Sequence, residues 1–393
     1  MNEVVITKLS GGLSRRSPEG DMTSGLLANG VAVSAGAQLN TTYRLAGLDD
    51  ALVLGLNPEY DTANNLLVYE HIKEFFRLNP NGELYIMLVA RTVTYANMLS
   101  PGATPPHAHN LLLAANGNIR QLGVAFNPPP GTPNLWDATL LAIAAGQQLA
   151  DQEYTQHRPV EVLLEGKGFN PATVANLRNL NAPNVTVMVG QAMSIAANNA
   201  GYAAIGALLG AVSKARVNES VAWVERFNLA GGSLDTIGLG GVVLSAVSQG
   251  NINNANQAGA VFFVAHTGTP GIYLNDSHTC TETTSDFAYI ENNRTIHKAV
   301  RNIRAALLPR LGSPVQIDSD SGQLAPEVIK SYETTGRRAL EAMLSNGEVS
   351  DIDVFVDPAQ NILSSSELQL AFSIVPTGTA RRISVTIGFV NPF

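Results

Sequence analysis

The sequence has little cysteine, little charge and no long apolar run, and each scarcity excludes a class of protein. Its single cysteine, Cys280, excludes an intrachain disulfide and a thiolate metal cluster within one chain. Charged residues make up 14% of the 393 residues and hydrophobic residues 45%, so the chain is not disordered and can bury a large core. The longest apolar stretch, residues 202–212, is short and broken by glycine, and no signal-peptide pattern opens the chain. We therefore expect a soluble, cytoplasmic protein without membrane insertion.

Net charge and repeats narrow the class further. The chain carries 24 Lys and Arg against 32 Asp and Glu, a formal charge of −8, which argues against general nucleic-acid binding. No period of about 20 to 50 residues recurs, so a solenoid is not expected. The length predicts two domains or more.

Strand-like patterns lie close to both ends of the chain. Apolar residues alternate with polar or small ones from residue 368 to 375, and the alternation resumes over residues 383–390. A shorter run near the N-terminus ends at Gly11 and Gly12. A two-stranded ribbon is only marginally stable alone and its free edge can accept another strand, so these patterns predict self-assembly. The residues expected to take part in strand exchange are Val4, Val5, Ile6, Leu368, Leu370, Phe372, Ile374, Ile383, Val385 and Ile387.

Helices and strands alternate through the middle of the chain. Asp61 or Thr62 is expected to cap a helix that carries Phe75 and Phe76. Gly206 and Gly210 would allow a close neighbour in a later, alanine-rich helix. The expected helices after the capped one cover residues 135–152, 171–180 and 196–215, and the expected strands cover residues 84–89, 160–164, 185–189 and 261–264. This alternation predicts an α/β fold of mixed α+β character, in which helices cover mixed sheets.

The texture of the chain changes after Gly231, where glycine and asparagine become frequent, and a domain boundary is expected in this region. Two helices are expected after it, over residues 292–311 and 326–347. The first helix is cationic, because no acid occurs between Glu291 and Asp318. By itself, such a pattern is typical of the solvated face of an amphipathic helix. Its basic residues include Arg294, Lys298, Arg301 and Arg304.

Residues that could carry chemistry are few. His107 and His109 are two apart beside prolines, which predicts a polar loop rather than a metal site. Residues 166–168 (Gly-Lys-Gly) follow a strand but lack the rest of a nucleotide-binding loop, so they are interpreted as a turn. A Cys-His-Asp nucleophile is conceivable, but no local signature surrounds the cysteine, which is interpreted as a packing residue. The residues of that alternative are His266, Asp276, His278 and Cys280. No catalytic, cofactor or metal site is expected.

The order of the patterns resembles a known family, the sheath proteins of contractile phage tails and related contractile injection systems. One block runs from a short helix and a Leu-Gly strand at residues 45–55 through the Phe75-Phe76 helix to an Asn-Gly turn and an apolar strand at residues 84–86. The other block runs from Asn293-Arg294 to residue 385. Its further landmarks are residues 329–344, Gly347, residues 354–357, Asn361, residues 368–376 and residues 382–385. The chain departs from the family at residues 379–382, where an acidic residue is common, and residues 101–260 do not align.

The resemblance implies a structural subunit, not an enzyme, that polymerises helically around a tail tube. On triggering, such a sheath becomes shorter and wider and drives the tube through a target envelope. The terminal strands would be exchanged between neighbouring subunits, and Arg294, Lys298, Arg301 and Arg304 would include residues that face the tube. The implied partners are other copies of the chain, in stacked hexameric rings, the tail tube protein, and baseplate and tail-terminator proteins.

The resemblance also implies where the protein acts and how it is divided. It would belong to a virion tail or an injection particle, assembled in the bacterial host cytoplasm. The expected parts are an N-terminal arm (1–25), an outer α/β domain (26–260), an inner tube-facing domain (261–350), and C-terminal strands with an arm (351–393).

Two other interpretations stay open from the sequence. One is an α/β hydrolase-like enzyme built on the sheet within residues 84–189, which would need a pocket of convergent titratable groups. The other is a self-assembling tube or shell protein that does not contract.

Overall fold

A computed structural model describes residues 20–199, 201–318 and 322–389. By the contacts among its residues, the chain divides into two compact units, Met1–His297 and Lys298–Phe393. The division falls inside the cationic helix. The domain boundaries expected near residues 260 and 350 stay predictions.

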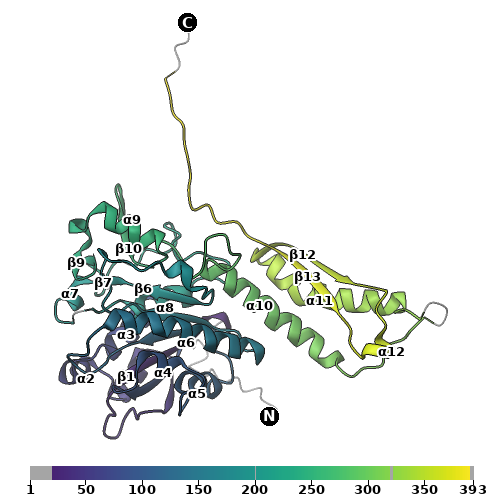
Figure 1. The fold of residues 1–393 in the computed structure, drawn as a ribbon, viewed down its shortest axis with the longest axis horizontal. Helices are drawn as coiled ribbons and strands as arrows, with labels where there is room; N and C mark the ends of the chain where they lie inside the picture. Colours follow the sequence, from purple (N-terminus) through teal and green to yellow (C-terminus); the bar gives the residue numbers. More distant parts are fainter. Residues whose placement is uncertain (1–19, 200, 319–321, 390–393) are drawn as a thin grey trace, which may run out of the picture. The chain divides into compact units, whose positions relative to one another are not determined.

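The first unit is built on a six-stranded mixed sheet with the order β2-β3-β1-β4-β5-β6 (Figure 1). Strand β2 runs antiparallel to β3, and the other neighbours are parallel. The strands are β1 (Thr23–Gly30), β2 (Thr42–Leu45), β3 (Glu83–Ala90), β4 (Gln121–Ala125), β5 (Glu161–Glu165) and β6 (Val185–Met188). The strands expected at residues 84–89, 160–164 and 185–189, and the mixed α/β class, are confirmed.

Helices cover both faces of this sheet, because successive side chains of its strands point to opposite sides. Leu26 belongs to the core on one face and Leu27 to the core on the other. Helices α3 (Val68–Leu78) and α8 (Ile205–Lys214) cover the first face. Helices α4 (Tyr95–Leu99), α5 (His107–Ala114) and α6 (Leu135–Thr155) cover the second. Both faces of β1 are buried over its whole length, as expected for a central parallel strand.

The two glycines of α8 bring its backbone against α3, which confirms the expected close neighbour. A Cβ atom on Gly206 would overlap the carbonyl oxygen of His71, and one on Gly210 would lie 2.9 Å from the carbonyl oxygen of Phe75. The helix expected over residues 196–215 is wrong in extent. It is split into α7 (Met193–Ala196) and α8, and Gly201 adopts a left-handed φ of 79° between them.

Asp61 caps a helix, but not as its preceding residue. It lies within α2 (Pro58–Asn64), which ends at left-handed Asn65, and its buried carboxylate accepts hydrogen bonds of 2.9, 3.1 and 3.0 Å from the backbone N–H groups of residues 68–70. These are first-turn donors of α3 that no carbonyl of the helix can satisfy. The expectation that the helix itself begins at residue 61 or 62 is wrong.

The remaining elements of the first unit are short. A helix was expected over residues 171–180, but only its end is helical, because the N–H of Leu177 donates to the carbonyl of Ala258 rather than to a preceding turn. The elements are η1 (Gly20–Met22), α1 (Leu48–Val53), η2 (Leu177–Leu180), β7 (Gly190–Ala192), β8 (Ile237–Leu239), β9 (Val242–Val243), η3 (Leu244–Ala246), α9 (Gln249–Gln257), β10 (Phe263–His266) and β11 (Thr269–Leu274). Strands β7, β8 and β9 form one antiparallel sheet, and β10 and β11 form another.

The second unit packs helices against a two-stranded antiparallel sheet. Its elements are the end of α10 (Ile290–Leu307), η4 (Leu308–Arg310), α11 (Pro326–Ser345), β12 (Val349–Val356), α12 (Ile362–Ser365) and β13 (Leu370–Pro376). Helix α11 begins with proline in its first turn and buries Tyr332, Leu340 and Met343, as expected.

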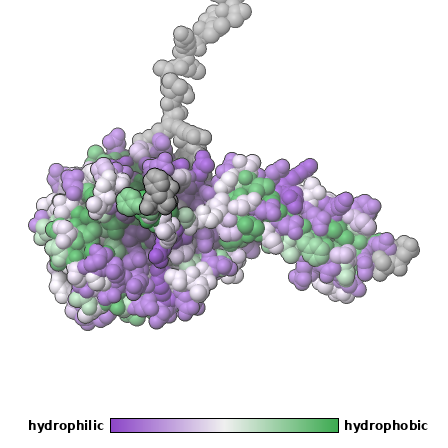
Figure 2. Space-filling model, turned by 90° about the horizontal axis from the view of Figure 1, so that it is seen from above, coloured by the Kyte–Doolittle hydropathy of each residue, from purple (hydrophilic) through white to green (hydrophobic). Residues whose placement is uncertain are grey.

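The surface in Figure 2 is mostly hydrophilic with scattered apolar patches. No helix in the described part of the chain is long and apolar enough to cross a bilayer.

Candidate functional site

The strand expected at residues 368–375 lies in a sheet of its own chain. Strand β13 pairs with β12, with Phe372 opposite Val354. The four apolar residues predicted for strand exchange here are half-buried and pack on the two small cores of the second unit. They are Leu368, Leu370, Phe372 and Ile374. In this subunit they therefore build the body of the sheet, and their exchange between copies stays a prediction.

A groove of about 600 Å³ follows the other strand of this sheet. Ile352 and Val354 are buried and Asp353 is exposed, and all three line the groove with residues of α11. Because these side chains point to opposite faces of β12, a cavity that they share lies at the edge of the strand. Within the described residues, β12 pairs only with β13, so this edge can accept an added strand.

The C-terminal segment after β13 exposes its apolar side chains. Ile383, Val385 and Ile387 are 80, 81 and 94% exposed, and residues 377–389 form neither helix nor strand (Figure 1). The strand expected at residues 383–390 is therefore not formed in the isolated subunit over its described part. A strand needs hydrogen-bonding partners along its edge, and the segment has none in its own sheet. We call residues 377–389 the C-terminal arm. Val4, Val5 and Ile6 lie outside the described residues.

The four basic residues predicted to face a tube have different environments. Arg294 is 3% exposed, and its guanidinium donates to the carbonyls of Ala215 at 3.1 Å and Asp21 at 3.3 Å. It lies inside the first unit, which corrects its assignment to the tube-facing surface. Helical periodicity could not reveal this, because the burying residues are distant in sequence. Of the others, Lys298 pairs with Glu348 at 2.6 Å, Arg301 is half-buried and Arg304 is exposed.

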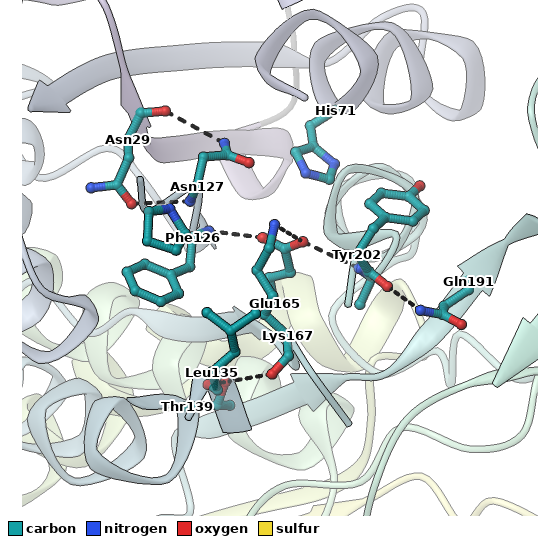
Figure 3. Close-up of polar contacts among 12 residues, drawn as sticks. Asn29, His71, Phe126, Asn127, Leu135, Thr139, Glu165, Lys167, Gln191 and Tyr202 are labelled. Atoms are coloured by element: carbon teal, nitrogen blue, oxygen red, sulfur yellow. Dashed lines mark hydrogen bonds and ion pairs between the residues drawn. The ribbon is translucent and has the colours of Figure 1, made fainter. Parts of the chain in front are cut away.

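The carboxyl edge of the six-stranded sheet is where an α/β enzyme would bind its ligand. The parallel strand order changes direction between β1 and β4. Two asparagines join the strands there: Asn127 N–H donates to Asn29 Oδ1 at 3.1 Å, and Asn29 Nδ2 donates to the carbonyl of Ala90 at 3.0 Å (Figure 3). The crevice between the two strands is therefore occupied by the protein's own side chains.

Beside the asparagines lies a buried carboxylate that sequence reasoning missed. Glu165, at the end of β5, is 0% exposed and accepts from the N–H groups of Phe126 at 2.8 Å and Ala203 at 3.1 Å. Lys167 Nζ lies 3.4 Å from the same side chain (Figure 3). Burial raises the pKa of Glu165 against the opposing effect of Lys167. Glu165 therefore ties together the segments that follow β4 and precede α8. An acid that closes an otherwise apolar strand was the available signal.

The histidine pair is not a metal site. His107 begins helix α5 rather than lying in a loop, which corrects the expectation. Residues two apart on a helix do not face each other, and His109 Nδ1 instead lies 2.7 Å from Glu153. Among the described residues, no group of three or more His, Cys, Asp and Glu side chains could hold a metal.

The cysteine lacks the setting of a nucleophile. Cys280 is buried in the second-face core, and burial raises the pKa of its thiol to about 12, away from the reactive thiolate. His278 lies 3.9 Å from Asp276, whereas His266 is an exposed residue of β10. The interpretation of Cys280 as a packing residue is confirmed. The interpretation of residues 166–168 as a turn also holds.

One buried acid makes the stability of the first unit depend on pH. Glu161 is 0% exposed and accepts from Asn184 Nδ2 at 3.1 Å, and burial raises its pKa to about 8. The unfolded carboxyl ionises above its ordinary pKa of 4.5, while the folded one stays protonated. The contribution to stability is thus full below pH 4.5 and is lost as the pH rises through about 8.

We therefore expect Glu161→Gln to gain stability relative to the wild type between pH 5 and pH 8. Both tryptophans, Trp136 and Trp223, lie in the first unit, so their fluorescence during denaturant unfolding follows that unit. The pKa of His71 is lowered to about 3 by burial, an effect of opposite sign that is common to both proteins and cancels in the comparison. The exposed Glu59→Gln variant is the control. A difference between Glu161→Gln and wild type that does not vary with pH would contradict the assignment.

Comparison with known proteins gives two family matches. The N-terminal domain of DUF2586 matches residues 1–278, and its C-terminal domain matches residues 286–393. No curated protein sequence matches the chain.

Solved structures give a likeness over almost the whole chain. The helical sheath of the anti-feeding prophage in the contracted state is 16% identical, with 98% of each chain covered and a TM-score of 0.62. The contracted PVC sheath complex of an extracellular contractile injection system is 12% identical, with 99% of this chain and 97% of that one covered and a TM-score of 0.59. A sheath tail protein from Desulfitobacterium hafniense is 11% identical, with 96% and 100% covered and a TM-score of 0.52. The chain has the fold of these sheath proteins, which confirms the resemblance found in its sequence.

Proposed function

The chain belongs to the DUF2586 family, and from this membership and its fold we propose that it is the structural subunit of a contractile sheath. It polymerises helically around a tail tube, then rearranges to a shorter, wider array that drives the tube through a target envelope. The observation that carries the proposal is the sheath fold over nearly the full chain, including that of two sheaths in the contracted state. The role is structural rather than enzymatic.

The subunits are joined by strand exchange through the C-terminal arm. The arm of one copy adds to the open edge of β12 in another copy, with Ile383, Val385 and Ile387 directed into the groove beside α11. Three features support this contact: the alternation of apolar residues in the arm, their exposure in the subunit, and the apolar floor of the groove. Strand β13 supplies the acceptor sheet, and Val4, Val5 and Ile6 are proposed as a second donated segment.

The contact with the tube is electrostatic and involves the part of α10 that lies in the second unit. Arg304 is exposed and Arg301 half-buried, and we assign them to face acids on the tube. Exposed pairs are worth only about 0–1 kcal/mol each, which suits a contact that must hold and then release.

Contraction requires two arrays of the same rigid units. The free energy released comes from the difference in contacts between the arrays, while the strand contacts keep neighbours connected. A head-to-tail contact that does not close produces such a helical array. Baseplate and tail-terminator proteins bound its ends, and stacked hexameric rings form its body. The protein would therefore act in a virion tail or injection particle, assembled in the bacterial host cytoplasm.

Electron microscopy of the purified protein at rising concentration, alone and with its tail tube protein, tests this function. We expect hollow striated cylinders that are wider without the tube than with it. Cylinders of a single width in both samples would favour a tube or shell that does not contract. Monodisperse monomers in both would overturn the proposal in favour of an enzyme.

The same assay tests the tube contact through Arg301→Glu with Arg304→Glu. We expect assembly on the tube to be lost while assembly of the protein alone is kept. The control carries two charge reversals at exposed positions of the first unit, Lys214→Glu and Arg216→Glu. Normal assembly of the Arg301/Arg304 variant on the tube would contradict the assignment.

A further inference from the structure

A second cavity, unrelated to assembly, lies at the carboxyl edge of the six-stranded sheet. It has a volume of about 350 Å³. The segments that follow β3, β4 and β5 line it through Arg91, Asn127 and Lys167. Because the carboxyl ends of parallel strands meet at one edge, these segments converge, and ligands of open α/β folds bind at this edge. Asn29 and Asn127 close the crevice itself, so the cavity lies beside it.

The lining of this cavity carries positive charge without a compensating acid. Two cations, Arg91 and Lys167, line it, and no described Asp or Glu does. Within the described part of the chain, Arg91 donates only to backbone carbonyls, those of Asn127 at 3.1 Å, Asn64 at 2.8 Å and Pro128 at 2.6 Å. Neutral carbonyls orient the guanidinium but do not cancel its charge. The nearest acid of the adjoining pocket, Asp61, is already hydrogen-bonded to the first turn of α3.

Lys167 is the second independent pointer to an anion. Its side chain is 10% exposed and lines the cavity. Its one hydrogen bond among the described residues runs to Glu165 Oε1 at 3.4 Å, while Glu165 also accepts from two backbone N–H groups. An ammonium group has three donors, so two remain for a ligand. Arg91, Lys167 and Glu165 together leave one net positive charge.

The first turn of α6 adds further donors. Leu135 lines the cavity, and the side chain of Asn134, at the N-cap position, does not cap this 21-residue helix. The turn that carries Lys167 is held against it, since the Thr139 hydroxyl lies within 3.5 Å of the Lys167 carbonyl and 3.2 Å of the Leu135 carbonyl (Figure 3). The N–H groups of a first turn and the helix dipole favour an anion. Asp137 in that turn is exposed and does not line the cavity.

We propose that this cavity binds a phosphate-sized oxyanion, held by Lys167, the field of Arg91 and the first turn of α6. The ligand is either free inorganic phosphate or the phosphate group of a small ester, since both offer the same charged oxygens. Residues 166–168 thus serve as an anion-binding turn. Binding at this site does not depend on the proposed assembly.

Thermal unfolding followed by tryptophan fluorescence tests this site, with sodium phosphate, sodium sulfate or glycerol 3-phosphate compared with sodium chloride at equal ionic strength. We expect phosphate to raise the midpoint by about 2 °C at ten times its dissociation constant. A larger shift with glycerol 3-phosphate would identify an ester as the ligand, and an equal shift with sulfate would identify a free oxyanion.

Two variants make the result specific to the cavity. Asn198→Asp places a carboxylate at an exposed lining position without touching the buried pair, and it should weaken phosphate binding by about tenfold. Lys167→Met should abolish it. The matched control, Asn253→Asp on α9, also at an exposed position, should bind as the wild type does. No shift with any oxyanion in the wild type, or an undiminished shift in Asn198→Asp, would overturn the proposal.

Discussion

Replacing Val385 and Ile387 with Asp should abolish assembly while leaving the subunit folded. Both side chains are more than 80% exposed in the subunit, so the substitutions remove no intramolecular packing. In the proposed contact each side chain becomes buried, which is worth about 1.5–3 kcal/mol, and a buried unpaired carboxylate costs more. Losing two such contacts per subunit should raise the concentration needed for assembly by at least about 100-fold.

The measurement is sedimentation and electron microscopy across a concentration series, with circular dichroism to show that the subunit is folded. The control places the same two charges on the alternate positions of the arm, Ser384→Asp and Thr386→Asp. These side chains point to the other side of an extended strand, so a much smaller effect is expected. Equal loss in both double variants would mean that charge, rather than the apolar side of the arm, governs assembly. Normal cylinders from the Val385/Ile387 variant would refute arm docking.

Substituting Gly206 with Val should strongly destabilise the first unit. Its Cβ would overlap a carbonyl oxygen of α3, and a backbone atom cannot rotate away as a side chain can. Overpacking of this kind typically costs about 1–3 kcal/mol, and the rigid partner places Gly206→Val at the upper end, about 3 kcal/mol. Denaturant unfolding followed by tryptophan fluorescence measures the loss.

A second helical glycine provides the comparison. Gly250 in α9 has no atom within 4 Å of where its Cβ would lie. Gly250→Ala should therefore leave stability unchanged or raise it by up to about 1 kcal/mol, through helix propensity alone. Wild-type stability in Gly206→Val would show that α3 and α8 do not approach as closely as described.

Most elements with a strong local pattern were predictable. The strand over residues 84–89, the helix over residues 135–152 and the first-turn proline of α11 carry their signals within a few residues of themselves. The close approach at Gly206 and Gly210 was also predictable, because small residues one turn apart allow two helices to meet. Extent was less predictable: alanine-rich composition favoured one helix where Gly201 separates two.

The candidate sites were predictable only in part. The apolar alternation of the arm was visible in the sequence, whereas the groove along β12 was not, because it depends on α11 lying beside that strand. Four regularly spaced basic residues predicted one charged surface, yet Arg294 is held by carbonyls of residues 21, 215 and 216. The anion cavity combines segments that follow three different strands.

By itself the sequence determined the class of this protein: its alternating helices and strands, its strand-like ends and the order of motifs that resembles sheath proteins. These are properties of neighbouring residues, whose periodicity and turn chemistry act locally. Only the tertiary structure decided which charges are buried, which strand edge stays open and which loops converge at the sheet's carboxyl edge. Burial and electrostatic environment are set by residues far apart in the chain, and no local pattern specifies which of them meet.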